Sequence, residues 1–164
     1  MEIDVSKVKE VREKTGAGIM AAKKALEESS GDVSKAEEIL KQQGLSNALK
    51  KSGRETSEGV IQSYIHAGNK IGAMVELKCE TDFVARTEEF INLSKDLAMQ
   101  VAAMSPNYIY PDDEGAKDST PEEILVSQSF IKDPSITIED MIKSMISKVG
   151  ENIKISKIIK FDLS

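Results

Sequence analysis

Apolar residues in two adjoining stretches of the chain follow two different periods. Every second position from residue 71 to residue 77 is apolar, which is typical of a strand with one buried face: Ile71, Ala73, Val75 and Leu77. From residue 90 apolar residues recur every three or four positions, which predicts an amphipathic helix: Phe90, Leu93, Leu97, Val101 and Met104. Between the two, Thr81 or Asp82 can cap the free N–H groups that begin a helix. The sequence therefore predicts a strand-to-helix junction at residues 80–83.

Phe83 stands right beside this cap, in a chain with only 4% aromatic residues. Two interpretations of its position are open: the ring packs back on the sheet, or the chain presents it to a partner. The residue pattern by itself favours core packing.

Three short helices are predicted in residues 1–44. The first covers residues 4–13 and has an apolar face: Val5, Val8 and Val11. The second carries an apolar stripe: Ile19, Ala22, Ala25 and Leu26. Asp32 can cap the third helix, and we expect Gly44 to end it. Three helices in so few residues bury only a small core, and modules of this kind are usually interaction heads.

The remainder of the chain predicts strands as well as helices. Residues 45–58 are polar and predict a linker, partly helical around 48–51. Residues 60–80 predict a β-hairpin that turns at Ala67-Gly68-Asn69. A short helix starts at Thr120-Pro121-Glu122-Glu123, and Thr137 can cap a last helix that Gly150 ends. An apolar strand completes the chain from residue 152 to residue 163.

The predicted fold class is α+β. It consists of a three-helix head at 1–44, a linker at 45–58 and a core at 59–164 of about three antiparallel strands packed with helices. A sheet this small exposes an edge and a face, which proteins normally cover. We therefore expect the core to self-associate.

The net charge of −6 argues against non-specific nucleic-acid binding, which normally needs a basic surface. One compact basic cluster exists, Lys50, Lys51 and Arg54, and we interpret it as a solvated linker face. No apolar run approaches the ~20 residues of a membrane span, and the acidic start of the chain is unlike a signal peptide. We expect a cytoplasmic protein, and the lack of an Arg-rich leader favours a bacterial cytoplasm over an organelle interior.

Cys79 and His66 are the only cysteine and histidine of the chain. They leave almost no material for a metal site or a nucleophile–base pair. We therefore expect no enzyme activity, no metal and no cofactor. We interpret Cys79 as a small hydrophobe of the strand and His66 as a strand or turn residue.

Two blocks of residues resemble bacterial and organellar elongation factor Ts. The first runs from Val8 to Met20 and continues through Lys23-Lys24-Ala25-Leu26, and it resembles the N-terminal ubiquitin-associated-type module of that family. The second, Glu80-Thr81-Asp82-Phe83-Val84-Ala85-Arg86, is similar to the core signature of the family. Gly68, Gly72 and Gly150-Glu151-Asn152-Ile153 also match, so the resemblance covers essentially the whole chain.

What the resemblance implies is a guanine-nucleotide exchange factor for the translational GTPase elongation factor Tu, active in translation elongation. Asp82 and Phe83 would push into the GTPase beside its magnesium and phosphate site, with Thr81 and Val84 in the same contact. The head would dock on another part of the same G domain through four residues: Lys9, Arg12, Ile19 and Met20. For Arg12 a merely solvated position stays open, and for Met20 a position in the core.

Many members of that family carry a second sheet subdomain or a long helical insertion, which this chain lacks. It resembles the short form, which in the family pairs two chains into a homodimer, here without a disulfide because residues 152–164 contain no cysteine. An adaptor of the ubiquitin-associated type without exchange activity is the alternative function. That alternative leaves residues 57–164 without a role.

Overall fold

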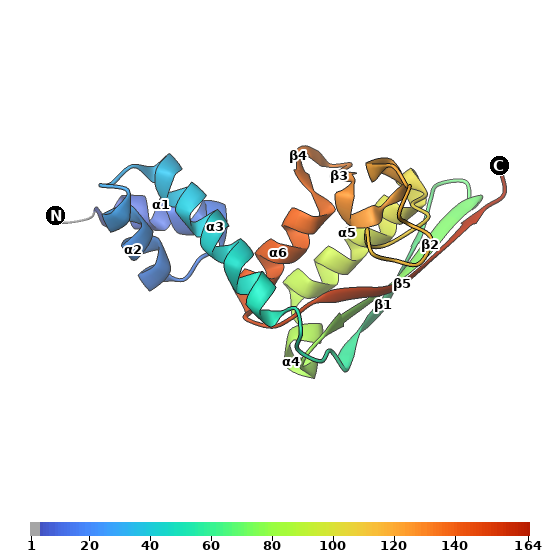
Figure 1. Ribbon diagram of the computed structural model, residues 1–164, viewed down its shortest axis with the longest axis horizontal. Coiled ribbons are helices and arrows are strands. Elements are labelled where there is room, and N and C mark those ends of the chain that lie inside the picture. Colours follow the sequence, from blue (N-terminus) through green and yellow to red (C-terminus); the bar gives the residue numbers. More distant parts are fainter. Residues whose placement is uncertain (1–3) are drawn as a thin grey trace. The chain divides into compact units, whose positions relative to one another are not determined.

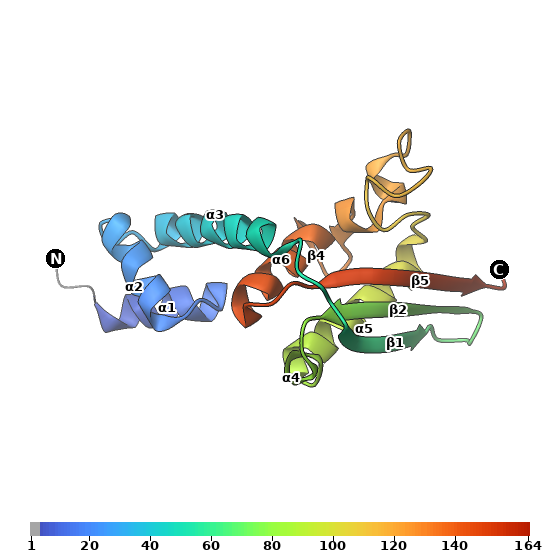
Figure 2. The ribbon, with the colours of Figure 1, turned by 60° about the horizontal axis from the view of Figure 1, so that its bottom comes forward.

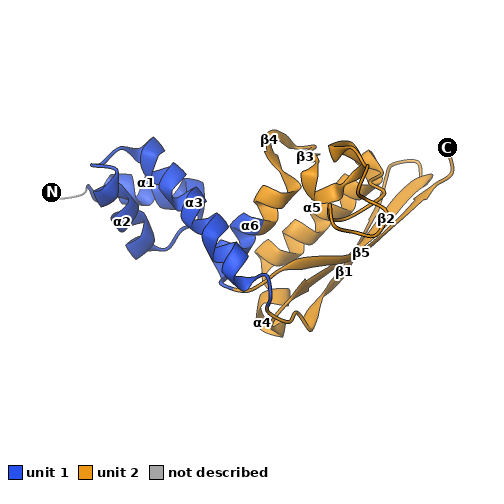
Figure 3. Ribbon diagram, in the orientation of Figure 1, with its two compact units in different colours: residues 1–53, 143–150 blue, residues 54–142, 151–164 orange. Residues whose placement is uncertain are grey.

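The computed structural model describes residues 4–164, which form two compact units (Figure 3). Unit 1 comprises the residues up to 53 together with 143–150, and unit 2 comprises 54–142 together with 151–164. Figure 1 labels the helices and strands. Helices and antiparallel strands occur together, so the predicted α+β class is confirmed.

Unit 1 is helical. It contains three complete helices and the C-terminal part of a fourth: α1 (Val5–Thr15), α2 (Ile19–Glu28), α3 (Val33–Lys51) and α6 (Ile138–Val149). The first three share a buried cluster, consistent with the predicted ubiquitin-associated-like head: Val11, Ala22, Ala25, Leu26, Ala36 and Leu40. Of the apolar face predicted for α1, Val11 is buried and Val8 packs against the cluster, whereas Val5 is 81% exposed.

The third helix is longer than the sequence predicts. Asp32 caps α3 as expected, since its Oδ1 accepts from the Lys35 N–H at 3.0 Å. The predicted end at Gly44 is wrong: α3 continues to Lys51 and takes in the first half of the predicted linker. Gly44 is buried at a close approach of α6, where an added Cβ would lie 3.3 Å from Ser147 Oγ. The missing side chain therefore serves helix packing, not helix termination.

Unit 2 is built on a three-stranded antiparallel sheet with β2 in the middle (Figure 2). Its strands are β1 (Glu58–Ile65), β2 (Ile71–Cys79) and β5 (Lys154–Asp162). The predicted hairpin and the predicted returning strand are both confirmed, with Gln62 opposite Val75 in β1–β2 and Val75 opposite Ile158 in β2–β5.

One face of the sheet is covered by α5 (Glu88–Met104), which runs across it (Figure 1). The alternation predicted for β2 is confirmed, since the residues on the covered face are buried: Ala73, Val75, Leu77 and Cys79. The predicted stripe of α5 is buried from Phe90 to Val101, whereas Met104 in the last turn is partly exposed. The core of unit 2 therefore lies between this helix and this face.

The segment between α5 and α6 contains only short elements. They are two 3₁₀ turns and a small hairpin: η1 (Pro121–Glu123), η2 (Leu125–Ser127), β3 (Ser129–Phe130) and β4 (Asp133–Thr137). The short helix expected at Thr120 is the single turn η1, closed by a capping box between Thr120 and Glu123. Thr137 caps α6 as predicted, with its Oγ1 accepting from the Asp140 N–H at 3.1 Å, and Gly150 follows the helix. The β3–β4 hairpin was not predicted, because its strands are too short to show a period.

Candidate partner-binding site

A one-turn helix, α4 (Asp82–Ala85), joins the end of β2 to the start of α5. We call residues 80–86 the tip. Of the two candidate caps, Thr81 is the one used: its Oγ1 accepts from the Val84 N–H at 3.4 Å. Thr87 caps α5 in the same way, accepting from the Phe90 N–H at 3.3 Å. A threonine cap thus stands on each side of the turn.

Phe83 projects from the tip with 80% of its surface exposed. Val84 and Ala85 are the buried residues of α4, so its first two residues face outward. The interpretation of Phe83 as a core residue is therefore wrong. Val84 was expected to contact the partner together with Thr81, Asp82 and Phe83. Its side chain is buried. An exposed aromatic ring on a capped turn is a suitable anchor for a protein interface.

Asp82 forms an ion pair with Arg86 in the next turn, with Oδ2 and Nη2 2.8 Å apart. Both side chains are substantially exposed, so the pair contributes little to stability. The pair puts a carboxylate and a guanidinium on the same exposed turn as Phe83. The tip therefore presents an apolar anchor together with two charged groups.

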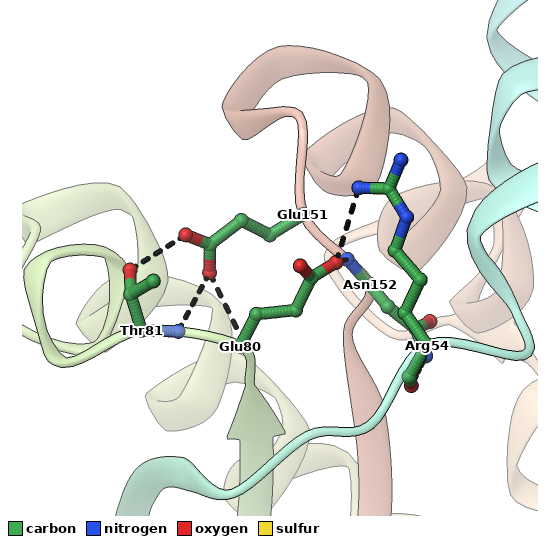
Figure 4. A network of polar contacts seen from close by, with 5 residues as sticks. All are labelled: Arg54, Glu80, Thr81, Glu151 and Asn152. Carbon is green, nitrogen blue, oxygen red and sulfur yellow. Dashed lines mark hydrogen bonds and ion pairs between the residues drawn. The ribbon is translucent and has the colours of Figure 1, made fainter.

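Glu151, in the turn before β5, binds the start of the tip (Figure 4). Its Oε2 accepts from the backbone N–H groups of Glu80, at 3.1 Å, and Thr81, at 3.0 Å. Its Oε1 accepts from the hydroxyl of Thr81 at 2.6 Å. Hydrogen bonds to an ionised acceptor are stronger than those between neutral groups, so the three bonds to Glu151 hold the backbone at residues 80–81 strongly.

Glu80 makes the reciprocal contact. Its Oε1 accepts from the backbone N–H of Asn152 at 2.7 Å and lies 3.5 Å from Nη1 of Arg54. The buried Asn152 donates from Nδ2 to the carbonyl of Arg54 at 2.8 Å. The two carboxylates thus join residues 80–81 and 151–152 crosswise (Figure 4).

This network could not be predicted from the sequence, because the residues that form it are distant in the chain and only the pairing of β5 with β2 brings them together. Glu151 and Asn152 belong to a block that resembles elongation factor Ts, which is the one signal that could have drawn attention to them. Arg54 was interpreted as part of a solvated basic cluster. Its side chain is exposed, as expected, and its guanidinium also pairs with Glu80, while Lys50 and Lys51 belong to the last turn of α3.

Cys79, the last residue of β2, is fully buried, and its Sγ donates to the carbonyl of Thr81 at 3.1 Å. Burial raises the pKa of the thiol to about 11, and the negative charge of Glu151 acts in the same direction. The side chain therefore stays a neutral thiol and packs as the small hydrophobe expected from the sequence. Its hydrogen bond to the Thr81 carbonyl joins the end of β2 to the tip.

The two basic residues predicted for head docking lie on the surface of α1. Arg12 is exposed, and its Nε donates to the carbonyl of Ala17 at 3.4 Å, in the loop that leads to α2. Lys9, one turn earlier, pairs with Glu13 at 3.8 Å. Exposed pairs of this kind contribute little to stability, so both cations remain able to contact a partner.

Ile19 and Met20 begin α2 and are 57% and 76% exposed. The interpretation of Met20 as a core residue is therefore wrong. Met20 also borders a shallow hollow of about 430 Å³ on α2 and α3, whose other lining residues are Ala21, Lys23, Lys24, Glu27 and Gln43. The head thus presents apolar side chains beside lysines, which suits a protein partner with apolar and acidic groups.

Comparison with known proteins matches nearly the whole chain to the family that its sequence resembles. A family model described as elongation factor TS matches residues 5–118 and 80–164. The elongation factor Ts of Thermosipho melanesiensis is 46% identical to this chain, and the alignment covers 97% of each protein. The chain belongs to the elongation factor Ts family. The family consists of translation elongation factors, and the resemblance stated from the sequence is confirmed.

Other elongation factor Ts proteins match equally broadly. That of Carboxydothermus hydrogenoformans is 43% identical over 95% of this chain and 87% of its own length. That of Methylacidiphilum infernorum is 45% identical over 98% of this chain and 95% of its own length. The tip lies within residues 80–118, which both matched segments of the elongation factor Ts model contain.

The described residues of the chain offer few groups that could act as a catalyst or hold a metal. His66 is exposed at the end of the β1–β2 hairpin, with Nδ1 3.0 Å from the hydroxyl of Tyr64. Among residues 4–164, no cluster of three or more histidine, cysteine or acidic side chains could hold a metal ion. No helix in the same range is long and apolar enough to span a membrane.

Proposed function

We propose that this chain is a guanine-nucleotide exchange factor that promotes GDP release from elongation factor Tu in the cytoplasm. Membership of the elongation factor Ts family supports the partner. The observation that carries the proposal is the exposure of Phe83 on a turn held by its neighbours, since a large apolar side chain in water has no role within unit 2.

The exchange step needs no covalent chemistry. A G domain holds its nucleotide through backbone donors around the phosphates and a bridging Mg²⁺. Asp82 and Phe83 enter beside this site and displace the elements that support those groups, so nucleotide affinity falls without contact to the base. Linkage makes the effect reciprocal: the factor by which the exchange factor weakens nucleotide binding is the factor by which nucleotide weakens binding of the exchange factor. The chain acts as a binding protein and not as an enzyme.

Unit 1 supplies a second contact with the same partner. Arg12 and Lys9 offer exposed cations, and Ile19 and Met20 offer exposed apolar side chains directly after them. Apolar anchors beside charged groups are typical of the centre of a specific protein interface. Docking through the head raises the local concentration of the tip at the G domain.

The core sheet pairs with a second copy of the chain. The face opposite α5 exposes large apolar side chains from all three strands: Ile61, Ile65, Met74, Ile159 and Phe161. An apolar face of this kind is normally covered, and a second copy offers the same face to it. The proposed assembly is a homodimer, which carries two tips.

The test is the release of labelled GDP from purified elongation factor Tu. We expect the chain to accelerate release, and Phe83→Ala to remove about 2–4 kcal/mol of that effect, as is typical of a buried aromatic anchor. Leu49→Ala, which also truncates an exposed apolar residue, here on α3, serves as the control. This variant should accelerate GDP release as much as the unsubstituted chain does.

Unchanged acceleration by Phe83→Ala would show that the insertion mechanism is wrong even though the family assignment stands. The alternative, an adaptor without exchange activity, is tested in the same series with ubiquitin as the binding partner. Binding of ubiquitin together with a failure to accelerate GDP release would favour the adaptor.

A further inference from the structure

Glu151 contacts the tip but takes no part in the exchange mechanism described above. We propose that Glu151 is a positioning residue, whose carboxylate holds the start of α4 so that Asp82 and Phe83 are already in the geometry required for insertion. The inference rests on the proposed exchange function. It assigns to the turn before β5 a role in exchange that is separate from partner contact.

The tip needs an external support because α4 has only four residues. A helix of one turn is far below the length that is stable by itself in water. Its C-terminal half is anchored by the burial of Val84 and Ala85. Phe83, with 80% of its surface exposed, contributes no packing that could hold the other half.

Glu151 supplies the missing support at the N-terminal side. One oxygen receives the consecutive N–H groups of Glu80 and Thr81, at 3.1 and 3.0 Å, which fixes the backbone that leads into α4. The other receives the hydroxyl of Thr81 at 2.6 Å. A threonine hydroxyl has one proton, so donation to Glu151 leaves its lone pairs free to accept from the Val84 N–H, at 3.4 Å. The carboxylate therefore orients the cap as well as the backbone.

The turn that carries Glu151 is itself held from the tip side. Glu80 accepts from the backbone N–H of Asn152 at 2.7 Å, so the two segments fix one another. This crosswise arrangement restrains Glu151 through hydrogen bonds at residues 80–81 and 151–152 (Figure 4). Loss of the carboxylate should consequently loosen the tip more than it disturbs the fold of unit 2.

Glu151→Gln is the sharpest variant because it keeps the size of the side chain. An amide has a single acceptor oxygen, so it retains either the two backbone N–H bonds or the Thr81 hydroxyl bond, but not all three. Glu114→Gln is the matched control, with the same change of charge on an exposed residue of the loop after α5. Circular dichroism and thermal unfolding establish that both variants are folded.

The readout is the rate of GDP release from elongation factor Tu as a function of exchange-factor concentration. We expect Glu151→Gln to lower the saturating rate about tenfold, the size expected for losing a charge-assisted hydrogen bond, while the half-saturating concentration changes little because the head contact is intact. Glu114→Gln should match the unsubstituted chain. The decisive step is the double variant: if Glu151 acts by positioning the tip, then Glu151→Gln causes a much smaller loss in a Phe83→Ala background, where only Asp82 remains to be positioned.

Thr81 gives a second, independent measurement should Glu151→Gln fold poorly. Thr81→Val removes the hydroxyl at constant shape and should reproduce the loss in saturating rate, whereas Thr81→Ser keeps the hydroxyl and should recover most of it. The loss caused by Thr81→Val should also be non-additive with that of Glu151→Gln.

Two results overturn the positioning role. They are a saturating rate for Glu151→Gln equal to that of Glu114→Gln, and a full-sized additional loss when Glu151→Gln is combined with Phe83→Ala. If the unsubstituted chain fails to accelerate release at all, the proposed exchange function falls, and the positioning role falls with it. The rate of the unsubstituted chain therefore distinguishes the two failures.

Discussion

At the scale of single residues, Gly59 shows how tightly the backbone of unit 2 is packed. Its φ of 154° lies outside the range that side-chain-bearing residues usually adopt, and an added Cβ would stand 2.2 Å from the carbonyl oxygen of Leu77. Gly59 pairs with Lys78 in the neighbouring strand, so the close approach is part of the β1–β2 ladder. Any side chain here must push the two strands apart.

Gly59→Ala is therefore expected to lower the free energy of unfolding by about 2–4 kcal/mol, the range for a steric clash combined with backbone strain. Gly53→Ala is the control, because an added Cβ at Gly53 would meet nothing within 4 Å, and it should change stability by less than about 0.5 kcal/mol. Urea unfolding measures this, followed by circular dichroism for the whole chain and by tyrosine fluorescence for unit 2, which contains all three tyrosines. Equal stability of the two variants would contradict the close approach.

Cys79 leads to a prediction about pH. Its pKa in the folded chain, about 11, lies above the ordinary value of 9.0, so folding favours the neutral thiol. The contribution to stability is complete below the unfolded pKa and is lost as pH rises from there through the folded pKa. Below both pKa values the folded chain should contain about 100-fold less thiolate than the urea-unfolded chain, and alkylation should slow by at least that factor. Equal alkylation rates before and after unfolding would contradict the burial of the thiol.

At the scale of elements, a buried glutamine connects α5 with the β3–β4 hairpin. Gln100 donates from Nε2 to Gln128 Oε1 and to the carbonyl of Ser129, both at 3.0 Å. Its Oε1 accepts from the backbone N–H of Ile131 at 3.0 Å. The two-residue strand β3 pairs only with β4. The hydrogen bonds of Gln100 therefore attach this hairpin to α5.

Gln100→Ala should cost about 3 kcal/mol of unfolding free energy, because it leaves buried polar groups of the hairpin without their partner. Asn92→Ala, at an exposed position of the same helix, is the control and should cost less than about 0.5 kcal/mol. Amide exchange at Ile131 provides a local measurement beside urea unfolding. Exchange that stays slow in Gln100→Ala would mean that the hairpin is held by other contacts.

At the scale of the whole molecule, the face of the sheet opposite α5 is the surface on which the proposed homodimer depends. Ile65 lies across Gly72, where an added Cβ would stand 2.7 Å from Ile65 Cδ1. Phe161 pairs with Gly72 from β5, the strand on the other edge of β2, so it lies on the same face as Ile65, and it is 65% exposed. The strands thus present a continuous apolar layer, and covering it removes that area from water.

Phe161→Asp should weaken the proposed homodimer at least about 100-fold, because a two-fold interface would bury the new carboxylate twice without a partner. Val5→Asp, an acidic substitution at an exposed apolar residue of unit 1, should leave the assembly unchanged. Light scattering at micromolar concentration measures both. A chain that is monomeric before substitution and fully active in GDP release would contradict the dimer.

Much of the candidate site could be read from the sequence. The change of period at residues 80–90 located the tip, and the resemblance of the tip and head blocks to elongation factor Ts identified the family. The exposure of Phe83 could not be derived from periodicity, because α4 is a single turn and a single turn has no repeat to read. The contact of Glu151 with Thr81 was invisible for a different reason: it joins residues 70 positions apart.

The sequence by itself determined the local structure of this protein: the β1–β2 hairpin, the stripe of α5, the caps at Asp32 and Thr137, and the α+β class. These features depend on neighbours in the chain, so period and capping chemistry specify them. Only the tertiary structure decided which small residues are packing sites, as at Gly44, and which carboxylates support the tip, as at Glu151. Those roles depend on what another segment places alongside, and the pairing of β5 with β2 provides that for Glu151.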